Sequence, residues 1–223
     1  MSNVITEQLT QAGQKIEHDS FAIVDHEAGP HDGYSEGEWQ IVRRMIHATA
    51  DFEFNGLSQF HPDAVAAGLN AIMNGAAIVA DVEMICVGLS KPRLAHFGVT
   101  THHFISDADV IAQAKADNTT RAVQAMRKAQ QQGLLDGGIV AVGNAPTALL
   151  EVLELIKQGK AKPALIVGMP VGFVSAAESK EALSELKEVP WIITQGRKGG
   201  STLVVSALHA LLALAEARQK STS

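Results

Sequence analysis

Several residue types are scarce in this chain, and each scarcity excludes a class of protein. The 223 residues include a single cysteine, Cys86, so an internal disulfide is excluded and a reducing cytoplasm is the expected location. Aromatic residues make up only 4%, so Ala, Val, Leu and Ile must build the core. Acidic residues outnumber basic ones, and the resulting net charge of −6 argues against a general nucleic-acid-binding protein.

Long hydrophobic runs are also missing. The N-terminal stretch MSNVITEQLTQAG has no apolar run of the signal-peptide kind, and the longest apolar stretch, 203–215, is interrupted by Ser206 and His209. We therefore expect no membrane partner. A content of 46% hydrophobic residues suits one α/β domain over 1–223. Within it we expect N-terminal helices over 1–75, packed on or beside a core over 76–217, and a short loose tail over 218–223.

Short apolar runs alternate with helical segments in the larger part of the chain. The runs are 76–81, 138–143, 164–169 and 191–196, with a weaker fifth near 100–105. Helical patterns cover 107–132, 146–158, 178–187 and 201–217, and upstream 5–25 and a segment that Pro62 opens and Asn74-Gly75 ends. Residues 52–60 are expected to be irregular or extended. Continuous apolar strands separated by helices predict neighbouring parallel strands in a sheet covered on both faces.

The stretch WQIVRRMIHATADFEF, residues 39–54, places one histidine among arginines. Its first half has helical spacing, with Ile41, Val42, Met45 and Ile46 on the core side, and SEGE at 35–38 fits a capping box. Arg43 and Arg44 lie four and three residues before His47 on that helix. Such a surface suits a proton donor that acts on an anionic substrate. A half-buried histidine with two solvated arginines explains the same spacing.

Two glycine turns follow predicted strands and lead into helices. In GNAPTALL, Asn144 is placed to cap a helix and Pro146 to open it. In GRKGGSTL, Arg197 and Lys198 add charge and Gly199-Gly200 allow close backbone approach. Free N–H groups at such turns favour an anion. Neither turn matches a nucleotide-binding pattern, and each is also compatible with an ordinary strand-to-helix connection.

The other notable cations extend this idea. Lys91 and Arg93 in GLSKPRL and Arg121 in DNTTRAV join the cations above as candidates to line one basic cleft, which would suit a substrate with several carboxylates. Solvated surface is the alternative. The nine histidines show no ligand spacing and no Cys/His cluster, so no metal site is predicted.

Four separated stretches, RRMIHATADFEF, GNAPTALLEVLELI, PALIVGMPVGFVSAAESKEAL and ITQGRKGGST, resemble the precorrin-8X methylmutase family, which includes the cobalt-precorrin-8 methylmutases of cobalamin biosynthesis. The resemblance implies a three-layer αβα, flavodoxin-like fold with a mostly parallel five-stranded sheet, and a homodimer with active sites near the interface. It implies an isomerase that moves a methyl group from C-11 to C-12 of an anionic tetrapyrrole, giving hydrogenobyrinate or cobyrinate. No cofactor is implied, and any cobalt belongs to the substrate.

The resemblance also implies roles for individual residues. His47 corresponds to the proton donor. Substrate contacts are expected from the matching motifs and from the candidate cleft: Ser20, Arg43, Ser90, Arg93, Arg121, Asn144, Arg197, Lys198, Gly199, Gly200 and Ser201. Ser90 stands where relatives often have threonine. IHATADF and GRKGGS are closer to the cobalt-dependent branch. Two other functions remain open: a non-catalytic carrier of a polyanionic tetrapyrrole, and an α/β enzyme that uses a phosphorylated substrate.

Overall fold

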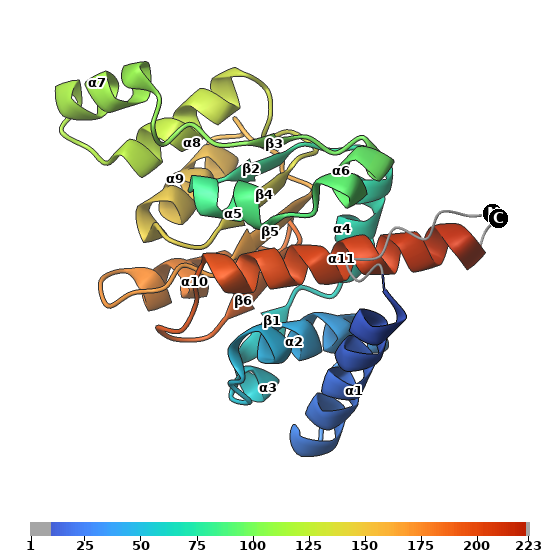
Figure 1. Ribbon diagram of the computed structural model, residues 1–223. Helices are drawn as coiled ribbons and strands as arrows, with labels where there is room; N and C mark the ends of the chain where they lie inside the picture. Colours follow the sequence, from blue (N-terminus) through green and yellow to red (C-terminus); the bar gives the residue numbers. More distant parts are fainter. Residues whose placement is uncertain (1–9, 222–223) are drawn as a thin grey trace.

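A computed structural model describes residues 10–221 and shows one mixed sheet between layers of helices (Figure 1). The strands are β1 Ser58–Phe60, β2 Ile78–Ala80, β3 Thr101–His102, β4 Ile139–Val142, β5 Leu165–Gly168 and β6 Trp191–Thr194. The helices are α1 Gln11–Glu27, α2 Glu36–Thr49, α3 Phe54–Leu57, α4 Ala64–Met73, α5 Glu83–Gly88, α6 Lys91–Phe97, α7 Ala108–Ala116, α8 Arg121–Gln131, α9 Pro146–Lys157, α10 Ala176–Ser184 and α11 Ser201–Ser221.

The sheet confirms the prediction made from the four apolar runs. Its order is β1-β6-β5-β4-β2-β3, and β2, β4, β5 and β6 are parallel neighbours. The weaker fifth run forms β3, parallel to β2. Without β1 the order is the 2-1-3-4-5 arrangement of flavodoxin-like folds.

A sixth strand corrects the predicted count of five. β1 is antiparallel to β6 at the sheet edge, with Gln59 opposite Ile193. Its sequence SQF has no apolar run, so only pairing with a strand more than a hundred residues away defines it.

Successive residues of the central strands face two separate cores, as expected of a sheet covered on both faces. Ile139 and Ala141 of β4 pack into the core formed with α2, α4 and α11, whereas Val140 and Val142 pack into the core formed with α8 and α9. The core is built mainly from aliphatic residues, as the low aromatic content predicted.

The last helix is a core element. By length and composition α11 could cross a membrane, but 56% of its apolar window is buried inside the protein. It lies between the sheet and α2 (Figure 1). The expected loose tail from residue 218 is wrong for most of its length, because α11 continues to Ser221.

The N-terminal helices lie outside α11. α2 packs on α11 through Val42, Met45 and Ile46, and α1 packs on α2 (Figure 1). α1 covers most of the helix predicted over 5–25, and its Ile16 and Ile23 side chains are 71% and 55% exposed. The first part of that predicted range, 5–9, lies outside the described residues.

The predicted helix over 107–132 is two helices. α7 ends at Ala116, Asn118 takes a left-handed conformation with φ 50°, and Thr120 caps α8 through its side chain. The short helices α5 and α6 were not predicted. The break places Arg121 at the start of α8, at the edge where the parallel strands end.

Candidate functional site

His47 lies in the last turn of α2, and its partner comes from another helix. The capping box of Ser35 and Glu38 begins α2, as predicted, and Ala50 ends it in a left-handed conformation with φ 54°. The side chain of His47 is exposed, and its Nδ1 lies 2.9 Å from Ser20 Oγ of α1. Within residues 10–221, Nε2 has no hydrogen-bond partner. The ring is therefore held at one nitrogen and open at the other.

The two arginines beside His47 are neutralised by acidic residues of α1. Arg43 Nη1 donates to Asp25 at 2.9 Å, and Arg44 Nη2 donates to Glu17 at 3.1 Å. Both guanidinium groups also lie over the ring of Phe21, which itself contacts His47 with centroids 4.9 Å apart. The structure thus gives these arginines a role in fixing α1 on α2, and the substrate contact predicted for Arg43 stays a prediction.

The GNAPTA turn (residues 143–148) already contains an anion. Asp81, fully buried at the end of β2, accepts hydrogen bonds from the backbone N–H groups of Gly143, Asn144 and Ala145 at 2.7–3.0 Å. Burial raises the pKa of Asp81, and these N–H groups act in the opposite direction. The expectation of free N–H groups for an external anion at this turn is wrong. Asn144 does not cap α9 either; Ala145 is the N-cap residue.

The GRKGGS turn (residues 196–201) is closely packed at its second glycine. A Cβ on Gly199 would lie 2.3 Å from Met169 O and 2.7 Å from Pro170 O, so no other residue fits without moving backbone. A Cβ on Gly143 would lie 2.7 Å from Ser201 Cα. The two glycine turns therefore touch, and the motifs that carry the resemblance meet at the carboxyl edge of the sheet.

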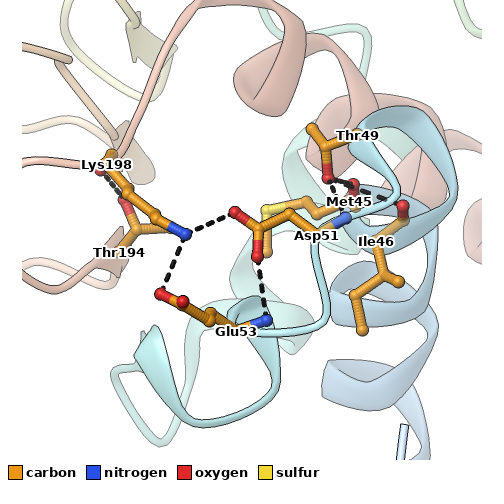
Figure 2. Close-up of polar contacts among 7 residues, drawn as sticks. All are labelled: Met45, Ile46, Thr49, Asp51, Glu53, Thr194 and Lys198. Carbon is orange, nitrogen blue, oxygen red and sulfur yellow. Dashed lines mark hydrogen bonds and ion pairs between the residues drawn. The ribbon is translucent and has the colours of Figure 1, made fainter. Parts of the chain in front are cut away.

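Lys198 links the GRKGGS turn to the segment after His47. Figure 2 shows its ammonium between the carboxylates of Asp51 and Glu53, and it contacts Glu53 at 2.8 Å. The hydrogen bond from Lys198 lowers the pKa of Asp51, and the two carboxylates raise the pKa of Lys198. The carbonyl of Lys198 accepts from Thr194 Oγ1 at 2.7 Å and from the buried Lys180 Nζ at 2.8 Å. Lys180, Asp51 and Glu53 were not singled out in the sequence.

Two predicted contacts remain exposed cations. Arg121 and Arg197 are exposed, and neither has a carboxylate partner in the described part of the chain. Arg197 lies 5.6 Å from the ring centroid of Phe173, an 85% exposed side chain. Thr120 Oγ1 lies 3.0 Å from Thr147 Oγ1, which places Arg121 beside the GNAPTA turn. These arginines are available to carboxylates of a ligand.

One predicted contact in GLSKPRL, Arg93, does not join this group. The Arg93 side chain is 5% exposed and its Nε lies 3.3 Å from Glu216 Oε1. Ser90 donates its backbone N–H to His209 Nε2 of α11, and the substrate contact predicted for its hydroxyl stays a prediction. The single basic cleft predicted from the sequence is therefore wrong for Arg93, which is inside the protein.

Backbone strain gathers at the motifs. In the described chain, three residues other than glycine have positive φ: Ala50 in HATAD, Asn118 in DNTTR and Ser175 in GFVSA. Such conformations cost energy and cluster at functional sites. Half-buried Cys86 lies in α5, and burial raises its thiol pKa, as suits a structural residue. Residues 10–221 contain no group of His, Cys, Asp and Glu placed to hold a metal ion.

Comparisons with known proteins agree with the motifs. The family model described as precorrin-8X methylmutase matches residues 15–214. The chain is 51% identical over 216 residues to a cobalt-precorrin-8 methylmutase of Leptospira interrogans, covering 95% of this chain and 98% of that one. It is 52% identical over 208 residues to one of Priestia megaterium, covering 93% and 91%.

A solved structure shows the same fold. It is a precorrin-8x methyl mutase from Thermus thermophilus, with a TM-score of 0.87, 57% identity, and coverage of 92% of this chain and 97% of that chain. The family match spans His47, both glycine turns and the whole sheet. The chain belongs to the precorrin-8X methylmutase family, the isomerases that act on a tetrapyrrole in cobalamin biosynthesis.

Proposed function

We propose that this enzyme moves a methyl group from C-11 to C-12 of precorrin-8X or cobalt-precorrin-8, with His47 as the general acid. The observation that carries the proposal is the geometry of the imidazole. Ser20 occupies Nδ1 at 2.9 Å, and Nε2 is open at an exposed position. In the imidazolium form Nδ1–H donates to the Ser20 hydroxyl oxygen, and the proton on Nε2 is the one that faces the open side for transfer to the substrate.

The proton makes the methyl shift easier without being consumed. Protonation of a ring nitrogen by His47 withdraws electrons from the macrocycle and eases the sigmatropic shift. The C-11–methyl bond breaks as the C-12–methyl bond forms, so substrate and product have the same atoms. The proton returns to the imidazole as the product leaves. General acid catalysis of this kind contributes roughly 10²- to 10⁴-fold in rate.

Carboxylates of the substrate are bound by the exposed arginines in this proposal. Arg197 and Arg121 flank the two glycine turns, and a charged hydrogen bond to each fixes the orientation of the ring. Asn144 offers an exposed amide at the same edge. Ser20 contributes as the partner of His47, and its direct contact with substrate stays a prediction.

The remaining parts of the proposal concern the oligomeric state, the cellular location and the cofactor requirement. We expect a cytoplasmic homodimer with its sites near the interface. His47 lies beyond α11 and Arg121 lies on the opposite face of the sheet. A second subunit would let one substrate reach both kinds of group, which supports the dimer. We expect no resident cofactor, and cobalt, where present, arrives with the substrate.

A phosphorylated substrate is less well supported by the site. The N–H groups of the GNAPTA turn are taken by Asp81, and its carboxylate would repel a phosphate there. The family match also favours the tetrapyrrole.

Turnover of purified tetrapyrroles tests the proposal. The protein is incubated with precorrin-8X and, separately, with cobalt-precorrin-8, and the absorption spectrum is followed as the methyl group moves. His47→Asn should bind product normally and lose roughly 10²- to 10⁴-fold in rate, because it keeps polarity and removes proton transfer. Ser20→Ala should lose less. A folded His47→Asn protein with wild-type turnover would contradict the role of His47, and binding without conversion by the wild type would indicate a carrier.

A further inference from the structure

The charge around Lys198 is not that of a cation waiting for a substrate. Its Nζ lies between two carboxylates, Asp51 and Glu53 (Figure 2). At neutral pH the three groups carry one positive and two negative charges. A substrate carboxylate that approached this ammonium would meet a net negative cluster and would have to displace an existing ion pair.

The backbone of Lys198 is fixed from the opposite side. Its carbonyl accepts from Lys180 Nζ at 2.8 Å and from Thr194 Oγ1 at 2.7 Å. Lys180 is 1% exposed and, among the described residues, has no carboxylate partner. Burial lowers its pKa to about 8. A buried ammonium is costly unless its hydrogen bonds are made, and this carbonyl is the acceptor that the fold supplies.

The other end of the link is the end of the His47 helix. Thr49 Oγ1 donates to Met45 O at 2.8 Å and accepts from Asp51 N at 3.2 Å, while Ala50 takes its left-handed conformation between them (Figure 2). Asp51 is four residues beyond His47 and its conformation follows from this helix end. The ion pair between Lys198 and Asp51 therefore also restrains the last turn of α2.

We propose that Lys198 is a positioning residue. Its backbone is held by Lys180 and Thr194, and its ion pairs with Asp51 and Glu53 connect the GRKGGS turn to the helix end that carries His47. These ion pairs fix the position of the proton donor relative to Arg197. This assignment rests on the proposed function and differs from the substrate contact that the motif implies for Lys198.

Variants that remove charge from Lys198 or from its two carboxylate partners distinguish a positioning role from a substrate-binding role. Lys198→Met keeps the aliphatic stem, and the double variant Asp51→Asn/Glu53→Gln keeps shape. A positioning role predicts a fall of roughly tenfold or more in kcat for both, because small displacements of a catalytic group are costly, with the product Kd within about threefold of wild type. Lys180→Met should behave in the same direction. Faster hydrogen exchange of the amides in 49–53 and 194–200 should accompany each loss.

A substrate-binding role predicts the opposite pattern. Lys198→Met would weaken product binding about tenfold or more, since a charged hydrogen bond is lost. Asp51→Asn/Glu53→Gln would tighten binding by freeing the ammonium. Either binding result, or a fall in kcat with unchanged exchange, would overturn the proposal. Wild-type turnover and His47→Asn decide the proposed function separately, and exchange is read without turnover.

Discussion

The GNAPTA and GRKGGS turns have the same sequence signature and opposite electrostatics. Each is a glycine turn between a parallel strand and a long helix. The first is filled from inside by the carboxylate of Asp81, which takes three backbone N–H groups. The second presents Arg197 to solvent, while its Lys198 is held by carboxylates from the segment after His47.

This difference shows that a helix N-terminus at a sheet edge is not a ligand site by default. Partial positive charge attracts the nearest carboxylate, and the protein can provide one itself. At the GNAPTA turn that carboxylate stabilises the fold. At the GRKGGS turn the side-chain charges are shared between a link inside the protein and an exposed arginine. The two turns can therefore be separated by experiment, one through stability and the other through binding and rate.

The largest effect on stability is expected from a substitution that disrupts the hydrogen bonds of the GNAPTA turn. Asp81→Asn replaces one acceptor oxygen with an NH₂ group that faces backbone N–H groups. The free energy of unfolding should fall by roughly 3 kcal/mol, and Tm by about 6–12 °C. Thermal unfolding followed by circular dichroism measures this. Glu83→Gln is the matched control, because Glu83 is exposed and two residues away. Equal Tm values for Asp81→Asn and the control would contradict the structural role of Asp81.

The exposed arginines are tested through product binding, which should depend on them and not on the GNAPTA hydrogen bonds to Asp81. Arg197→Ala and Arg121→Ala should each raise the product Kd by about tenfold, the lower end for a charged hydrogen bond because both sites are open to water. The loss should shrink at high salt. Titration followed by absorption measures Kd at two ionic strengths. Arg218→Ala, at the far end of α11, should leave Kd unchanged. Unchanged Kd values for both test variants would remove these arginines from the site.

The smallest effect concerns the support beneath the GRKGGS turn. Lys180 has a folded pKa of about 8, against an ordinary 10.5. Between these values the unfolded chain binds a proton that the native state lacks. The Lys180 contribution to the free energy of unfolding therefore rises with pH across this window and is unfavourable below it. Lys180→Met should remove a rise of about 1 kcal/mol over the first unit above pH 8.

Urea unfolding at several pH values compares the slopes of wild type and Lys180→Met. Only the slope matters, because the lost hydrogen bond to Lys198 O changes the offset. Parallel stability curves for the two proteins would show that Lys180 does not titrate in this window.

Local pattern was enough to predict much of the fold. The apolar runs gave the parallel strands β2, β4, β5 and β6, and the Ser35–Glu38 capping box gave the start of α2. Each of these signals is local, because it depends only on residues that are close to one another in the chain. The four separated motifs are specific enough to indicate the family from the sequence alone, and the family match over residues 15–214 agrees with them.

The partners of the charged and catalytic groups were decided only by tertiary structure. Ser20 meets His47 across 27 residues, Asp81 meets Gly143 across 62, and Lys198 meets Asp51 across 147. No periodicity records contacts of that range, because they depend on how helices and turns pack around the sheet. The sequence by itself determined the strands, the α2 helix and the residue types of the site. The packing decided which cations are neutralised and which nitrogen of His47 remains open.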